Sequence, residues 1–422
     1  MNSVKYSGTG RFVDLVSENA ITGRKINYPA MSINQQGGYI DLTFEKFECI
    51  VSHSAKFFYQ HFSNIDFLKF RNVGFLSHSD SLYLFNMLGL MKVNVAPVLI
   101  SPRNSLEATI HLLKESSSQA LIYQEMFNDW AVEIKKQIPS ILLIPRWAAD
   151  ISQSFSLQEY NLVRPLDTIE EELQNVSYIL HSSGSTSYPK LVPQRNFTIH
   201  NSGHRFGLEA TDPARKELNF FPLFHAAGVL TMVVSHIYEM KSVILSPDMS
   251  PGNHYSSKMI LQLIKQLSPK ILWILPLMAK ELIEHCNNIP KPHGWDVLKL
   301  IECIKYGGAQ LPSMMIHDLF DHGITPCSMF GLTEAGMILK CYPDKNSKFL
   351  VPFTPFEHLK YKFKDLGDDI GELIILGNDP CLADVKDLDE EGNYPTKDLF
   401  QIVGQNPIKL NYVSRADDTI VH

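Results

Sequence analysis

Short apolar runs alternate with longer amphipathic stretches through the first part of the chain. Four runs of four to six residues read as strands: 73–76, 93–98, 120–123 and 141–144. Between them, apolar positions recur at helical spacing over residues 79–91 and 104–116, and Ser79 or Asp80 is the expected N-cap of the first helix. Strands that alternate with helices in this way predict an α/β fold, with parallel sheets covered by helices and ligands bound at the carboxyl ends of the strands.

The pattern changes after residue 342. Residues 349–402 are β-prone, with a strand expected over 371–376 and turn sequences at 367–369, 377–379 and 391–393. This region predicts a small antiparallel, barrel-like β subdomain attached to the α/β body.

Composition and charge exclude several classes of protein. Of the 422 residues, 45% are hydrophobic and 20% charged, as in an ordinary globular protein. The net charge of −7 argues against a nucleic-acid partner, which would require a basic face. Six cysteines without CxxC or zinc spacing favour a reducing compartment. No apolar stretch reaches the length of a membrane span and no signal peptide is visible, so we expect a cytoplasmic protein without a membrane contact.

The segment 178–193, YILHSSGSTSYPKLVP, is the first that suggests chemistry. An apolar strand enters a loop of hydroxyl side chains around Gly184, and Lys190 follows at the start of a second strand. Glycine allows a left-handed turn, and backbone N–H groups and hydroxyls can then converge on phosphate oxygens. The nucleotide-binding pattern GxxxxGK[ST] is absent, so the segment is not a P-loop. The competing interpretation is an ordinary surface turn.

The fuller pattern Ser-Ser-Gly-Ser-Thr-x-x-Pro-Lys resembles the phosphate loop of the adenylate-forming (ANL) superfamily, which includes acyl-CoA ligases and peptide-synthetase adenylation domains. Five further segments match this family in order: FPLFHAAG at 221–228, YGGAQLP at 306–312, FGLTEAG at 330–336, TKD at 396–398 and RADDTI at 415–420. The resemblance implies ATP/AMP and Mg²⁺ as cofactors and activation of a small-molecule carboxylic acid as its adenylate.

The resemblance also implies a role for each matched residue. The β- and γ-phosphates would be bound by Ser182, Ser183, Gly184, Ser185, Thr186 and Lys190. Thr333 would contact the α-phosphate, Glu334 would hold Mg²⁺, Asp398 would accept both ribose hydroxyls, and Arg415 would contact the ribose or the phosphate edge. The adenine would lie against Gly307, Gly308, Ala309, Phe330 and Gly331. The residues expected to be catalytic are Thr333, Glu334, His225 and Lys190.

The acyl pocket is implied to lie at Phe221, His225, Gly228, Val229, Gly308 and Met337. No acidic residue occurs from 220 to 235, so a substrate ammonium group would lack a partner, which favours an aryl, α-keto or fatty acid over an amino acid. Taken singly, Glu334 also fits a solvated surface acid, Phe330 and Met337 fit core residues, and His225 fits a hydrogen-bonded core histidine.

Two glycines of the family pattern are replaced, by Lys397 and Ser414, and a lysine costs free energy if its φ is positive. The resemblance implies a hinge at Asp417 and, after it, a lid domain with a catalytic lysine. We therefore expect 1–342 to be the α/β core, 343–413 the small β subdomain and 414–422 the hinge and start of an absent lid. Such a core is expected to bind ATP and acid but to adenylate poorly.

Within the superfamily, HSSGSTSYPK and RADDTIVH resemble fungal adenylate-forming reductases. That branch implies downstream carrier and reductase domains in cis, with phosphopantetheine on the carrier and NADPH on the reductase; no GxGxxG fingerprint for NADPH occurs in this chain. The alternatives are the core of a stand-alone acyl-CoA ligase and a nucleotide-binding scaffold without catalytic activity.

Overall fold

The computed structural model describes residues 4–35, 38–62, 71–182, 188–207, 212–247, 254–288, 293–342 and 352–418. The chain divides into two compact units. Unit 1 consists of Met1–His204, Asp212–Ala214 and Phe221–His254, and unit 2 of Arg205–Thr211, Arg215–Phe220 and Tyr255–His422. The boundaries predicted at 342 and 413 stay predictions.

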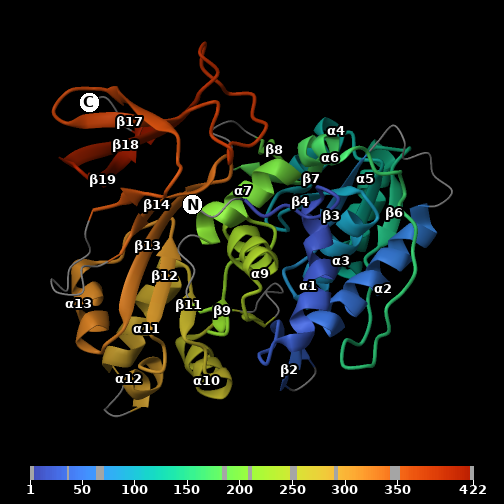
Figure 1. Cartoon of the computed structure of the whole chain (residues 1–422), viewed down its shortest axis with the longest axis horizontal. Helices are drawn as coiled ribbons and strands as arrows, with labels where there is room; N and C mark the ends of the chain where they lie inside the picture. The colour runs from blue at the N-terminus through green and yellow to red at the C-terminus, as the bar shows by residue number, and fades with distance from the viewer. Residues whose placement is uncertain are drawn as a thin grey trace. The chain divides into compact units, whose positions relative to one another are not determined.

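A six-stranded sheet is the centre of unit 1 (Figure 1). Its order is β6-β5-β3-β4-β7-β8, and every neighbouring pair is parallel except the antiparallel hairpin β7–β8. The expected α/β alternation is thus confirmed. The strands are β3 (Asn72–Leu76), β4 (Ala96–Ile100), β5 (Ala120–Tyr123), β6 (Leu142–Pro145), β7 (Val176–Ser182) and β8 (Lys190–Arg195).

Helices cover both faces of this sheet. A Cβ on Gly74 would lie 2.2 Å from Leu113 of α4 (Leu106–Glu115). The next residue, Phe75, packs instead against Tyr83 of α3 (Ser81–Lys92), with ring centroids 4.5 Å apart. Because successive strand residues point to opposite faces, α3 and α4 lie on opposite sides of β3. The helices are α3 (Ser81–Lys92), capped by Asp80 as one of the two expected caps, α4 (Leu106–Glu115) and α5 (Asn128–Gln137).

The second predicted strand begins later than expected. The N–H of Val93 still bonds to the carbonyl of Gly89 at the end of α3, and Asn94 adopts a left-handed φ of 69°. Residues 93–95 therefore form the helix exit, and β4 starts at Ala96. An apolar run alone does not distinguish the end of a buried helix from the start of a buried strand.

The remainder of unit 1 is a small sheet and several helices. β1 (Met31–Gln35) pairs with β10 (Val243–Leu245) in parallel and with β2 (Gly38–Leu42) in antiparallel. The helices are α1 (Leu15–Thr22), α2 (Phe44–Phe62), α6 (Ile169–Gln174), α7 (Asn196–Gly207, whose residues from 205 belong to unit 2), α8 (Ala226–Gly228), a π-helix (Val229–Val234) and α9 (Ser235–Glu239).

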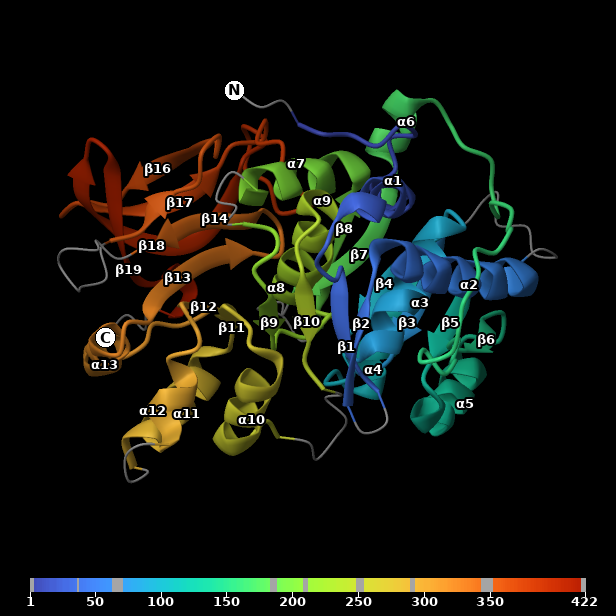
Figure 2. The same ribbon diagram turned by 60° about the horizontal axis from the view of Figure 1, so that its bottom comes forward.

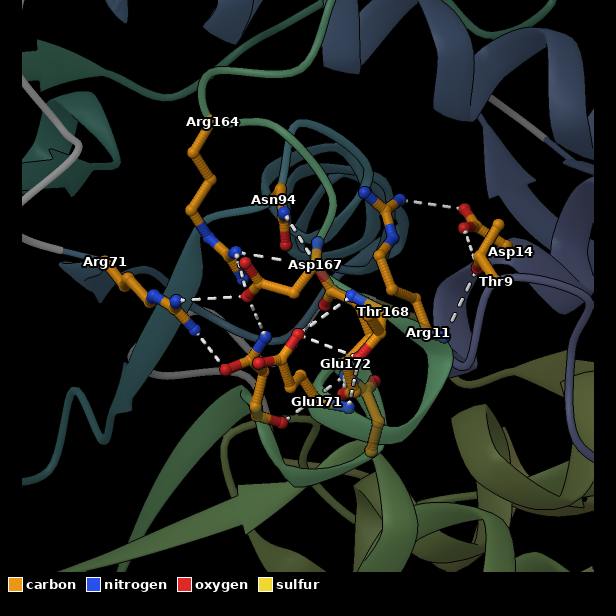
Figure 3. Close-up of polar contacts among 12 residues, drawn as sticks. Thr9, Arg11, Asp14, Arg71, Asn94, Arg164, Asp167, Thr168, Glu171 and Glu172 are labelled. Carbon is orange, nitrogen blue, oxygen red and sulfur yellow. Dashed lines mark hydrogen bonds and ion pairs between the residues drawn. The ribbon is translucent and has the colours of Figure 1, made fainter.

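A polar cluster anchors the segment that leads into β7 (Figure 3). The carboxylate of Glu172, fully buried, accepts from the N–H of Asp167 at 3.1 Å and pairs with Arg164 at 3.5 Å. Thr168 and Glu171 form a capping box at the start of α6. Because a buried charge is tolerated only when it is paired and hydrogen-bonded, these contacts fix the entry to β7 and thereby the position of its carboxyl end.

Unit 2 contains a second parallel sheet. β11 (Ile271–Trp273) pairs in parallel with β9 (Glu217–Asn219) and with β12 (Cys303–Gly307), and β12 pairs in parallel with β13 (Thr325–Leu332). β14 (Gly336–Cys341) and β15 (Thr354–Pro355) extend it in antiparallel. Its helices are α10 (Ser257–Leu267), α11 (Pro276–Asn288), α12 (His293–Leu298) and α13 (Ser313–Asp321).

The C-terminal part of unit 2 is a four-stranded antiparallel sheet beside β14 (Figure 2). Its strands, in spatial order, are β16 (Tyr361–Asp365), β17 (Ile370–Ile375), β18 (Tyr394–Gln405) and β19 (Ile408–Arg415). The predicted antiparallel character is confirmed. Ile338 and Leu339 of β14 share one buried cluster with Leu373 and Phe400 of this sheet, so the two sheets are held together by a common core.

Among the described residues, no helix is long and apolar enough to cross a membrane.

Candidate active site

The ends of the predicted phosphate loop lie on the hairpin β7–β8 of unit 1. Ser182 is the last residue of β7, and Lys190 is its partner in register at the start of β8. Lys190 is exposed. The predicted phosphate ligands Ser183, Gly184, Ser185 and Thr186 lie outside the described residues. The hairpin nevertheless places both ends of the loop at the carboxyl end of β7, the edge at which parallel sheets bind ligands.

Two histidines are close together at this edge of unit 1. His181 accepts a hydrogen bond at Nε2 from the N–H of Ser101 (3.1 Å), which directly follows β4. Burial, and secondly the neighbouring His225, lower the pKa of His181 to about 4, and burial with the charge of Arg103 lowers the pKa of His225. Both imidazoles are therefore neutral at pH 7. His225 lies close to His181 of the phosphate-loop hairpin, and its catalytic role stays a prediction.

The segment after His225 is held by close packing. A Cβ on Gly228 would lie 2.0 Å from the carbonyl oxygen of Pro222, so glycine is required there. Phe221 and Val229 are buried, and Val229 begins the π-helix. π-Helical turns are rare and often occur at functional sites. The predicted acyl-pocket residues of unit 1 thus lie on one short, irregular segment.

In unit 2, the pair Gly307-Gly308 forms the turn after β12. A Cβ on Gly307 would lie 2.6 Å from the carbonyl oxygen of Met329 in β13, and Gly308 has a φ of +93°. Glycine is therefore favoured at 307 because a side chain would clash with β13, and at 308 because the backbone is left-handed. Gly308 and Ala309 are exposed, so the backbone of this turn is open to a ligand.

Phe330 and Gly331 lie at a bulge in β13. The ring of Phe330 packs against the rings of Phe400 and Tyr412 of the antiparallel sheet, with ring centroids 5.3 and 5.8 Å apart. The residue nevertheless stays partly exposed. Gly331 pairs in register with Met337 of β14, and the register shifts between 330 and 331. Phe330 is thus part of the core on one side, and stacking of its remaining surface on adenine stays a prediction.

Thr333 and Glu334 form the turn between β13 and β14. The carbonyl of Glu334 accepts from the N–H of Ala383 (2.7 Å), and its side chain hydrogen-bonds to Tyr394. Both residues are partly buried, and Glu334 is close enough to Asp398 for its charge to oppose the ionisation of that carboxyl group. Glu334 is therefore not a fully solvated surface acid.

Asp398 is an acid of unit 2 whose pKa is strongly raised. It is 3% exposed, and no described residue hydrogen-bonds to its buried Oδ2. Burial raises its pKa to about 6; Asp417 and Glu334 raise it further, whereas Arg415 and a hydrogen bond from Tyr412 lower it. A buried acceptor without a donor is costly, which is the condition expected of a site that a ligand's hydroxyl or N–H group completes.

Arg415 and Asp417 lie next to this carboxylate. Arg415 is the partner in register of Asp398, and its Nε lies 3.3 Å from Oδ1 of Asp417. Oδ2 of Asp417 is 3.6 Å from Nζ of Lys397. The structure thus brings together Glu334, Asp398, Arg415 and Asp417 from three separate stretches of sequence.

Lys397 adopts the left-handed conformation that glycine favours, with a φ of 62°. We expect Lys397→Gly to be more stable than Lys397→Ala by about 1 kcal/mol, because both variants lose the Asp417 contact but only glycine relieves the Cβ strain. Urea unfolding of the two variants measures this difference. Equal midpoints would show that the backbone at this position of β18 carries no such strain.

Sequence reasoning missed two kinds of feature. Tyr394 and Tyr412, which hydrogen-bond to Glu334 and Asp398, are two of 16 tyrosines, and only their nearness to the TKD and RADDTI segments could have marked them. It also missed a cavity of about 230 Å³ in unit 2. The cavity lining includes Gln310 and Leu311 after the glycine turn, Ser328 of β13, Phe353 and Asn411.

Comparisons with known proteins identify the family of the chain. The AMP-binding enzyme family model matches residues 18–377. A carboxylic acid reductase of Neurospora crassa is 24% identical over 376 residues, covering 83% of this chain and 34% of that protein. An adenylate-forming reductase of Aspergillus terreus is 26% identical over 276 residues, covering 63% of this chain and 24% of that protein. The chain thus spans about a third of the length of the first relative and about a quarter of the second.

Solved structures share the fold. The o-succinylbenzoate CoA synthetase MenE of Bacillus subtilis, in complex with its acyl-adenylate intermediate OSB-AMP, superposes with a TM-score of 0.74 at 18% identity, covering 95% of this chain and 99% of that one. A long-chain-fatty-acid-CoA ligase of Archaeoglobus fulgidus superposes with a TM-score of 0.76 at 16% identity, covering 98% of this chain and 86% of that one. With a family model that matches most of its length and this fold, the chain belongs to the AMP-binding enzyme family, the adenylate-forming superfamily that its motifs indicated.

Proposed function

We propose that this chain activates a carboxylic acid with ATP as an acyl-adenylate. The observation that supports this most is the buried, incompletely hydrogen-bonded carboxylate of Asp398, grouped with Arg415 and Glu334 in unit 2. Such a carboxylate accepts hydrogen bonds from ribose hydroxyls, and the neighbouring guanidinium carries charge for the nucleotide.

Each remaining group has a part in the reaction. Thr333 donates its hydroxyl to the α-phosphate, Lys190 and Ser182 with the loop between them bind the β- and γ-phosphates, and Gly307, Gly308 and Ala309 offer backbone to adenine. Bringing a carboxylate to a phosphate means bringing two anions together, so positioned donors and cations supply most of the catalysis.

Glu334 would hold Mg²⁺. The ion is usually bound by one or two carboxylates together with substrate phosphates, and the carboxylate of Glu334 fits that need. When bound, Mg²⁺ neutralises charge on the phosphates. The described residues include no cluster of three ligating side chains, which agrees with a site completed by the nucleotide.

The acid is proposed to be aryl, α-keto or fatty. His181 and His225 are neutral at pH 7, and Phe221 and Val229 are buried apolar residues. The segment 220–235 carries no carboxylate for a substrate ammonium. An amino acid would leave its charge without a partner.

We further propose that the chain is the adenylation part of a multidomain reductase, which passes the acyl group to a phosphopantetheine carrier for reduction by NADPH. The fungal reductases among the relatives support this. MenE, a CoA synthetase, supports the alternative of a stand-alone acyl-CoA ligase.

ATP–pyrophosphate exchange tests the proposal. The natural protein that contains this chain is assayed with aryl, α-keto, fatty and amino acids. Exchange with one of the first three classes is expected. Exchange with amino acids only would refute the substrate class, and AMP binding without exchange for any acid would indicate a scaffold without catalytic activity.

The pKa of Asp398 predicts a pH dependence of AMP binding. The folded-state pKa of about 6 means that the carboxylate gains a proton as the pH falls through 6, and a protonated acid accepts hydrogen bonds less well. AMP should therefore bind more weakly at pH 5 than at pH 7, measured by calorimetry. The control ligand 2′,3′-dideoxy-AMP has the same phosphate but no ribose hydroxyls, so the ratio of the AMP affinity to its affinity cancels the titration of the phosphate. A ratio that does not change with pH would contradict the prediction.

A further inference from the structure

Two cysteines on neighbouring strands of unit 2 have their sulfur atoms in contact. Cys303 begins β12, Cys327 lies in β13, and their Sγ atoms are 3.4 Å apart. In the register of the two strands, Thr325 lies opposite Cys303 and Lys305 opposite Cys327. The thiols are therefore diagonal neighbours on one face of the sheet, and a disulfide of about 2.05 Å would require the sulfur atoms to approach by about 1.4 Å.

The surroundings shift the pKa values of the two thiols in opposite directions. A hydrogen bond from Cys327 and the charges of Lys305 and Arg215 lower the pKa of Cys303, against burial and the Glu217 charge. The same hydrogen bond and burial raise the pKa of Cys327. Cys303 is partly exposed and Cys327 is 1% exposed. A more acidic thiol on a partly exposed residue, beside a second thiol on a fully buried residue, is the arrangement of a cysteine that oxidises and one that resolves it.

We propose that Cys303 and Cys327 are an oxidisable pair that a hydroperoxide converts into a disulfide across β12 and β13. The Cys303 thiol loses its proton and the thiolate attacks the peroxide, forming an S–O bond and breaking the O–O bond; the departing oxygen takes up that proton and leaves as an alcohol or water. Cys327 then attacks the sulfenic sulfur, the S–S bond forms, and the hydroxyl leaves as water. Two thiols are oxidised and one peroxide is reduced.

This bond would connect the two strands that carry the nucleotide turns. β12 ends at Gly307, beside Gly308 and Ala309, and β13 leads through Phe330 to Thr333. Diagonal neighbours in a sheet are about 7–8 Å apart, whereas disulfides span Cα atoms about 4.4–6.8 Å apart. Closing the bond must therefore move the strands and disturb both turns, so oxidation is expected to weaken nucleotide binding. This consequence rests on the proposed function, but formation of the disulfide does not.

Peptide mapping tests the disulfide. The folded protein is treated with a small excess of hydrogen peroxide, alkylated and digested without reductant. A cross-linked pair of peptides that contains Cys303 and Cys327 is expected, lost in Cys303→Ser and in Cys327→Ala and retained in Cys341→Ser, a buried cysteine on the next strand. Thermal melts confirm that the variants fold. Reduced Cys303 and Cys327, or Cys303 oxidised to sulfinic acid without the cross-link, would overturn the proposal.

AMP binding tests the consequence. The cross-linked protein should bind AMP at least about fivefold more weakly than the reduced protein, equivalent to about 1 kcal/mol, and dithiothreitol should restore the affinity. Unchanged affinity in fully cross-linked protein would refute the coupling. If the reduced protein does not bind AMP, the proposed function fails, and the disulfide is still decided by peptide mapping.

Discussion

Glu334→Gln is expected to lower the rate of ATP–pyrophosphate exchange by about 10²–10³-fold, the usual loss when one preorganised group at a developing charge is removed. Glutamine keeps the shape of the side chain and can still hydrogen-bond to Tyr394, but it removes the negative charge that would hold Mg²⁺. The affinity for AMP without Mg²⁺ should change little, because the proposed role is in the reaction with ATP. Exchange kinetics and calorimetry measure the two quantities.

Glu390→Gln is the matched control, because Glu390 is an exposed glutamate of the same unit outside the grouped side chains. It should retain full exchange. An equal loss in both variants, or a loss of AMP affinity in Glu334→Gln as large as the loss of exchange, would contradict the proposed metal role.

Asp398→Asn should weaken AMP binding by about 10–100-fold, since a hydrogen bond to a charged group contributes about 1.5–3 kcal/mol. The variant should nevertheless melt at a higher temperature than the wild type at pH 7. The folded-state pKa of about 6 lies above the ordinary aspartate value of 3.8, so the folded protein binds the proton more tightly and the stability falls as the pH rises through that interval. Asparagine removes this cost at pH 7.

Unfolding of the variant would lower both the AMP affinity and the melting temperature. An affinity that falls while the melting temperature rises therefore cannot result from unfolding. The control ligand is 2′,3′-dideoxy-AMP, which should bind wild type and Asp398→Asn equally. Equal losses for AMP and the dideoxy analogue would exclude Asp398 as the partner of the ribose hydroxyls. A lower melting temperature at pH 7 would show that the Asp398 carboxylate stabilises the unliganded protein.

Local pattern was sufficient for much of the fold. The spacing of apolar residues predicted the α/β alternation and a strand close to β17, because period 2 and period 3.6 follow from backbone geometry alone. The predicted start of β4 was wrong. Val93 and Val95 are buried in the exit from α3, just as they would be in a strand, so their apolar character does not distinguish the two. Tertiary packing, which no local window contains, decided that boundary.

For the candidate site, the sequence by itself determined which residue types are present and, through the family motifs, which chemistry they suit. Only the tertiary structure decided their states. Asp398 is a buried acid with a raised pKa because of the strands around it and the charges of Asp417, Glu334 and Arg415, which come from other segments. The same holds for the contact between Cys303 and Cys327, 24 residues apart, which exists because β12 and β13 pair in one particular register. Electrostatic energy and bond formation depend on distances between side chains, and those distances are set by how the strands pack.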